Sequence, residues 1–204
     1  MGFGTIICWN LLFSVLFLFD KVGVQMKILQ HFKTITAHRH AVIRHCAKVG
    51  LLWQGLRHDL SKYSPAEFLT GAKYYAGDKS PNVNERMQNG YSAAWMHHKG
   101  RNKHHFEYWT DFSIAEQKIL PVEMPLEYVV EMFCDRVAAC KIYKGDKYTD
   151  RAALDYYNNG KDYRSIHPKT AKLLENWLIM LADEGEEKTF AHIRKLLQEH
   201  KKRK

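Results

Sequence analysis

The sequence contains few cysteines, and none of them forms a Cys-x-x-Cys pair. The four, Cys8, Cys46, Cys134 and Cys140, lie far apart along the chain. Zinc knuckles need paired cysteines and disulfide scaffolds need a dense framework of them, so neither is predicted. A reducing compartment is the simpler interpretation, and we therefore expect a cytoplasmic protein.

Sustained alternation of apolar and polar residues, which would indicate half-buried strands, is also absent from the sequence. Apolar residues instead recur at three- and four-residue intervals, as in "ILQHFKTITAHRHAVIRHCAKVG", which closes on Gly50. The most regular helical segment runs from Pro125 to Gly145. A chain of 204 residues can bury one sizeable core. We predict an all-α fold, with a single compact helical domain over residues 26–200 and a basic tail at 201–204.

Shorter signals refine this helical frame. "SPAE" at Ser64–Glu67 has the composition of a capping box with proline at the first helical position, and "SIAE" at Ser113–Glu116 is a second candidate cap. Residues 77–90 are polar and rich in turn formers, so they predict a loop. Residues 145–164 form another polar connection, which is either a lid over a site or a surface loop.

The first 25 residues differ from the rest of the chain. Residues 3–19 are uncharged and largely apolar, slightly short of the roughly 20 residues that span a bilayer as a helix. They lack the basic start and the cleavage site of a secretory signal. Three interpretations stay open: a membrane anchor, a buried helix, or an over-long start with Met26 as the functional first residue. The first would give a membrane-anchored protein.

Lysine and arginine exceed aspartate and glutamate by nine charges. This excess favours an anionic partner such as a nucleotide, a phosphate ester, nucleic acid or a lipid headgroup. One candidate is therefore a non-enzymatic helical module that binds nucleic acid through Arg101, Lys103, nearby aromatic residues and the tail "HKKRK". The tail alone is weak support, because terminal charge runs are usually solvated.

Residues that commonly bind metals are concentrated at four places. They are His38 with His45 on one helix, the pair His58–Asp59, the stretch "WMHHKGRNKHHFEYW" at 95–109, and Asp135. Asp135 lies among apolar neighbours in "MFCDRVAA". If it is buried, its carboxylate needs a cation or several hydrogen bonds to stay ionised.

The order of these residues carries a resemblance. Their order resembles the ligand order of the HD-domain metal-dependent phosphohydrolase superfamily. It runs from a histidine to "HDLSK" at 58–62, then to further histidines and a late aspartate. The text from His38 to about Tyr157, with "HDLSKYSPAEF" and "HHKGRNKHHFEYW", further resembles an uncharacterised family of bacteria and phages related to that superfamily. The resemblance implies an HD-domain-like helical core.

The resemblance also implies the metal ligands. One ion would be held by His38, His58, Asp59 and Asp135, although His40 and His45 compete with His38. A second ion would take one of His97 or His98 and one of His104 or His105, with Asp59 bridging. Adjacent residues on a helix diverge by about 100°, so all four cannot face one site, and His98 with His104 is the chosen pair. Imidazoles and carboxylates suit one or two ions of iron, manganese, zinc, nickel or cobalt better than magnesium or calcium.

Several further residues receive candidate roles. Lys62 lies one turn from Asp59 and can point its ammonium at the same phosphate. Glu107 can orient a histidine or shuttle a proton, so Asp59, Lys62 and Glu107 are the candidate catalytic residues. Candidate substrate contacts are Arg101, Lys103, Lys147 and Arg151.

The leading expectation is hydrolysis of a small phosphate ester, a nucleotide or another phosphorylated metabolite, by a metal-activated water. The first alternative is a di-iron oxygenase, because resemblance to the inositol oxygenase branch implies the same ligand order. The second is the nucleic-acid-binding module described above, which needs no metal.

Overall fold

The computed structural model describes the backbone of residues 3–203 and the side chains of residue 23 and residues 25–203. Within these residues the chain is mostly α-helical, which confirms the predicted fold class. A single two-stranded antiparallel sheet accompanies the helices in the described chain. The helices are α1 (Phe3–Lys48), α2 (Leu52–Arg57), α3 (Pro65–Tyr74), α4 (Pro81–Asn89), α5 (Ala93–Lys99), α6 (Leu126–Lys144), α7 (Ala152–Asn158), α8 (Pro168–Glu184) and α9 (Glu186–Lys202), with short 3-10 turns η1 (Leu60–Tyr63), η2 (Phe106–Tyr108), η3 (Gly145–Lys147) and η4 (Lys161–Tyr163).

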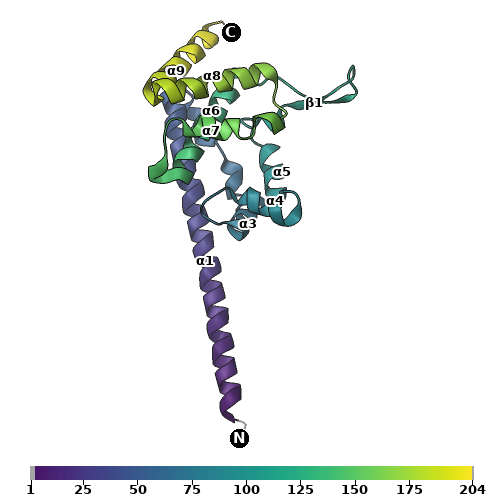
Figure 1. The fold of residues 1–204 in the computed structure, drawn as a ribbon, viewed down its shortest axis with the longest axis vertical. Coiled ribbons are helices and arrows are strands. Elements are labelled where there is room, and N and C mark those ends of the chain that lie inside the picture. Colours follow the sequence, from purple (N-terminus) through teal and green to yellow (C-terminus); the bar gives the residue numbers. More distant parts are fainter. Residues whose placement is uncertain (1–2, 204) are drawn as a thin grey trace.

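Helix α1 supplies the first wall of the structure. Figure 1 shows its N-terminal part extending away from the other helices and its C-terminal part packed among them. Among the described residues, the buried side chains of α1 lie on one stripe of the helix that runs from His31 to Cys46. This stripe faces α2, α3 and α6. The helix ends just before Gly50, whose φ of +83° is left-handed, so the glycine stop predicted there is confirmed.

Helix α6 is the central element, and its bounds confirm the prediction from Pro125 and Gly145. It contacts α1, α7, α8 and α9. Its apolar side chains, including the fully buried Phe133 and Val137, join a core with Trp177 of α8 and Phe190 of α9. The aromatic rings of Phe133 and Phe190 lie 5.6 Å apart between centroids, so this side of α6 is closely packed.

Two of the shorter predictions were wrong. Residues 77–90 are not a loop throughout, because α4 occupies Pro81–Asn89, with proline in its first turn and Gly90 in the left-handed conformation at its end. "SIAE" is not a helix cap but the turn of a β-hairpin formed by β1 (Thr110–Ser113) and β2 (Lys118–Pro121). Ser113 does accept a bond from the Glu116 amide, but inside that turn. Strands this short give too little alternation for period-two patterning to predict them.

Two other predictions were right in position and wrong in detail. Helix α3 begins at Pro65 as expected, but the Ser64 side chain makes no capping bond and Glu67 bonds to histidines instead. The polar connection at 145–164 is packed structure, since α7 lies within it and buries Ala153 and Tyr157 against the core.

Among the described residues, no helix is both long and apolar enough to cross a membrane. The apolar segment 3–19, the candidate anchor, lies outside the side chains that the structure describes. The predicted anchor, buried helix and alternative start at Met26 therefore remain predictions.

Candidate metal centre

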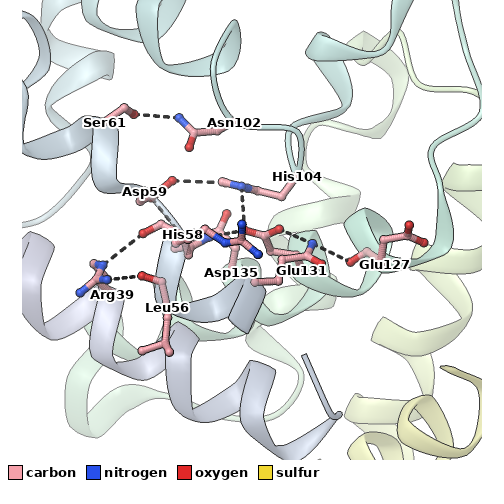
Figure 2. Close-up of polar contacts among 12 residues, drawn as sticks. Arg39, Leu56, His58, Asp59, Ser61, Asn102, His104, Glu127, Glu131 and Asp135 are labelled. Atoms are coloured by element: carbon pink, nitrogen blue, oxygen red, sulfur yellow. Dashed lines mark hydrogen bonds and ion pairs between the residues drawn. The ribbon is translucent and has the colours of Figure 1, made fainter. Parts of the chain in front are cut away.

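The centre is built around a strained turn between α2 and η1. Asp59 has φ +54° and ψ +26°, a left-handed conformation that is uncommon outside glycine. Arg39 of α1 holds this turn, because its guanidinium donates hydrogen bonds to the carbonyl oxygens of His58, at 3.2 Å, and Leu56 (Figure 2). The result is that His58 and Asp59, although adjacent, are both almost completely buried. Such strain is often found at functional sites.

A first group of ligand atoms joins α1, this turn and α6. Nε2 of His38 lies 2.9 Å from Oδ1 of Asp135, and Nε2 of His58 lies 3.6 Å from the same oxygen. Oδ2 of Asp59 lies 3.2 Å from Nε2 of His58 and 3.9 Å from Nε2 of His38. Each of the four residues offers one atom within 4.8 Å of the others, which is close enough for one metal ion.

A second group meets the other oxygen of Asp59. Oδ1 lies 3.3 Å from Nε2 of His98 on α5 and 3.4 Å from Nε2 of His104 in the segment before η2. His105 also contributes an atom to this group, which again fits within 4.8 Å. The two oxygens of Asp59 therefore face two different sets of imidazoles.

Two buried glutamates hold the outer sides of these rings. Nδ1 of His58 and Nδ1 of His104 lie 2.8 and 3.2 Å from the same oxygen of Glu131 (Figure 2). Nδ1 of His98 lies 2.7 Å from Glu67. Because a carboxylate only accepts, each Nδ1 must carry the proton, which leaves the lone pair of a neutral ring on the inward Nε2. This is the arrangement of metal-binding histidines whose second nitrogen is fixed by a carboxylate.

The inward atoms have no hydrogen-bond partners of their own. Nε2 of His58, His98 and His104 and Oδ1 of Asp59 are buried in the described structure without any hydrogen bond of acceptable geometry. Buried polar atoms nearly always find a partner, because leaving one unpaired costs about 1–3 kcal/mol. A group of unpaired nitrogen and oxygen atoms that converge on one place has the chemistry of a transition-metal site.

The electrostatics of the centre keep its carboxylates ionised. Burial by itself would raise the pKa of Asp59, but His58, Lys62 and His98 outweigh it and hold that pKa well below its usual value. Burial likewise opposes ionisation of Asp135, yet His38 and His58 hold its pKa well below the usual value. Both aspartates are therefore anionic at neutral pH, as metal ligands need to be.

Histidine positions left open by the sequence are distinguished by the structure. His38 faces the centre, whereas Nδ1 of His45 contacts the Cys134 carbonyl at 3.2 Å and its ring packs on Phe190. His97 bonds to Glu67 at 2.6 Å and has no place in either group. In the pair His97–His98 only His98 therefore faces inward, as we expected of each adjacent pair.

Of the remaining candidate residues, some lie beside the centre and others lie apart from it. Nζ of Lys62 lies 2.7 Å from Oδ2 of Asp59, beside the first group. Glu107 on η2 belongs to neither group, but its Oε2 is buried without a partner and burial raises its pKa. Arg101 and Lys103 line a pocket with His104, whereas Arg151 pairs with Asp155 on α7 and no described contact joins the exposed Lys147 to the centre.

Two residues of the centre, Glu67 and Glu131, were not predicted from sequence, and a third, His105, was only an alternative to His104. Glu131 precedes Asp135 by one helical turn and so shares its face of α6, a signal that could have revealed it. Glu67 was assigned to a capping box, which hid it. His105 was considered as an alternative to His104 but not alongside it, because neighbours on a helix diverge; residues 101–105 are not helical, so that rule does not apply to them.

These observations define a class of protein: a helical protein with buried histidine and carboxylate groups close enough to hold metal ions. The chain belongs to the family of unknown function DUF5662, whose model matches residues 27–180. That range contains every residue of both groups. The search of curated proteins found no match, and neither did the search of solved structures.

Proposed function

We propose that the chain is a metal-dependent hydrolase of phosphate esters with an HD-domain-like centre. The observation that carries this proposal is the Asp59 carboxylate, whose two oxygens face two separate groups of imidazoles. A carboxylate placed in this way is suited to bridge two ions. The ligand order His38, His58–Asp59, Asp135 supports the relation to that superfamily.

The first group would hold one ion through His38, His58, Asp59 and Asp135, and the second would hold another through Asp59, His98, His104 and His105. Divalent iron, manganese, zinc, nickel or cobalt fits this donor set. Ions bound there would lower the pKa of a bound water and stabilise the charge of a phosphoryl group.

The chain's own side chains suit the same reaction. The Lys62 ammonium, beside Asp59, can pair with a phosphate oxygen. Glu67 and Glu131 keep the ligand nitrogens of His98, His58 and His104 directed inward. Glu107, whose pKa is raised by burial, can retain a proton for a leaving oxygen.

The substrate class follows from charge. The chain carries an excess of nine positive charges, and Lys62 places one of them at the centre. Anionic esters are attracted by such a field, and a neutral polyol, as an HD-type oxygenase would use, is not. A nucleotide or a small phosphorylated metabolite is therefore the favoured substrate.

The test is elemental analysis of full-length protein purified without chelators, with a phosphoesterase panel run on the same sample. We expect one or two transition-metal ions per chain and release of phosphate. Asp59→Ala should abolish the second ion and lower turnover by more than the roughly 10–100-fold typical of a change outside the ligand shell.

Asp155→Ala is the matched control, because Asp155 is exposed and pairs only with Arg151 among the described contacts. It should leave metal content and turnover unchanged. Full turnover in Asp59→Ala would overturn the proposal. Iron together with oxygen consumption on a polyol, and no phosphate release, would support the oxygenase instead.

A further inference from the structure

A pocket of about 430 Å³ opens beside the metal centre. It lies between α2, the segment before η2, and α6. Two residues of α2, four of the segment and two of α6 line it: Gln54, Arg57, Arg101, Asn102, Lys103, His104, Tyr128 and Glu131.

The pocket is strongly basic. Arg57, Arg101 and Lys103 are all exposed at its walls. Arg57 donates one hydrogen bond to the Trp53 carbonyl, and Arg101 donates one to the His97 carbonyl. A guanidinium has five N–H donors, so most of them remain for a ligand.

Glu131 is the sole carboxylate among the lining residues. One of its oxygens lies against His58 and His104, and the other accepts a hydrogen bond from Gln54. Its negative charge is therefore already engaged within the protein. The pocket as a whole offers three cations to an incoming anion.

The basic segment is held in place before any ligand binds. The Trp109 indole N–H donates to the Lys103 carbonyl at 2.7 Å. Figure 2 shows the second contact, in which the Asn102 amide donates to Ser61 at 2.8 Å. Nζ of Lys103 lies 5.9 Å from the centre of the Tyr128 ring. Because these contacts fix the segment, less entropy is lost when it binds an anion.

The pocket borders the metal centre but is lined by few of its residues. His104 and Glu131 line it, whereas His38, His58, Asp59, His98 and Asp135 do not. An anion on the three cations would thus lie outside the group of atoms that face Asp59. Neither metal nor hydrolysis is needed for such binding.

We infer that this pocket is a binding site for a small multivalent anion of the phosphate class, held by Arg57, Arg101 and Lys103. Inorganic pyrophosphate is the probe, because it presents several oxygens to three cations without requiring a particular organic group. The site extends the proposed function by providing a second place for phosphate groups next to the catalytic centre.

The experiment is calorimetric titration of pyrophosphate into the full chain and into a variant with Arg57→Gln, Arg101→Gln and Lys103→Gln. We expect the wild-type chain to bind and the variant to bind at least about tenfold more weakly, because the variant lacks all three of the cations that would pair with the anion. Circular dichroism and metal content should be unchanged.

The matched control removes the same charges from the region of α9, with Arg194→Gln, Lys195→Gln and Arg203→Gln. These three residues are exposed, and none of them lines the pocket. Their removal should change the affinity by less than about twofold, because the Debye length limits the effect of distant charges.

Three outcomes would overturn the inference: no binding to the wild-type chain, equal affinity in wild type and pocket variant, or an equal loss in the α9 control. Equal affinity would indicate that pyrophosphate is held at the metal centre, and an equal loss would indicate a net-charge effect. The two proposals can be distinguished. If no ester in the phosphoesterase panel is hydrolysed but only the pocket variant binds pyrophosphate more weakly, the hydrolase proposal is wrong and the anion-binding site is supported.

Discussion

The two faces of α6 line interiors of opposite chemistry. One face presents Phe133 and Val137 to Trp177 and the other helices of the apolar core. The other presents Glu131 and Asp135 to the histidines of the metal centre. Burying apolar surface stabilises the fold by about 25 cal/mol per Å². Burying charged and unpaired polar atoms costs free energy, so stability does not explain the second face.

The backbone shows the same contrast. On the apolar side, α6, α8 and α9 are regular helices. On the polar side, Asp59 holds a left-handed conformation, and the segment that carries His104 and His105 is not helical. Backbone strain and buried charge are often found at functional sites, so this comparison supports the proposed site on one side of α6.

The largest expected effect on stability lies on the apolar face. Phe133→Ala should lower the free energy of unfolding by about 3–5 kcal/mol, because it removes a fully buried ring and leaves a cavity. Denaturant unfolding followed by circular dichroism measures this. Metal bound per folded molecule should stay the same.

Phe133→Leu is the companion variant, since it keeps most of the volume and should cost much less. It preserves a folded sample if Phe133→Ala does not fold. Loss of metal from folded Phe133→Leu would break the comparison, because it would show that the two faces of α6 are not independent.

A smaller effect, of a different kind, is expected on the polar face. Glu131→Gln keeps the shape of the side chain but weakens its hold on Nδ1 of His58 and His104. Metal affinity should fall by about 10–100-fold while the unfolding free energy of the metal-free chain changes little. Competition with a chelator measures the affinity, and unchanged metal affinity would contradict the assigned role.

The smallest effect is expected away from both faces, where α9 begins. Glu186 lies 2.5 Å from Lys48 and also pairs with Lys141, and although burial opposes its charge, these lysines lower its pKa to about 2. Because the pKa of Glu186 is lowered on folding, its ion pairs with the two lysines stabilise the folded chain at pH values above the ordinary pKa of glutamate. This stabilisation is lost as the pH falls from about 4.5 toward 2.

Glu186→Gln should therefore cost at most about 1 kcal/mol at pH 7, since the lysines are partly exposed. Unfolding measured at pH 7 and at pH 3 provides the check. The difference from wild type should shrink at the lower pH, and a difference that grows there would show that the sign of the linkage is wrong.

The sequence was most informative where a residue's role is local. Helical spacing and the stops at Gly50 and Gly145 predicted the C-terminal part of α1 and all of α6, since backbone preferences act over a few residues. It was least informative in short elements. The strands of the β-hairpin at Thr110–Pro121 are too short for an alternating pattern, and the polar, turn-rich composition of residues 77–90 hid α4 although Pro81 and Gly90 mark its ends.

By itself, the sequence determined the helical class and the types of candidate ligand residue, because hydrophobic spacing and side-chain chemistry are properties of each residue. It also indicated which chain segments carry them. Only the tertiary structure decided that His38 rather than His45 faces inward, that Asp59 lies between two groups, and that Glu67 and Glu131 hold the rings. The physical reason is that these relations join residues far apart in the chain, and packing alone sets their distance and direction.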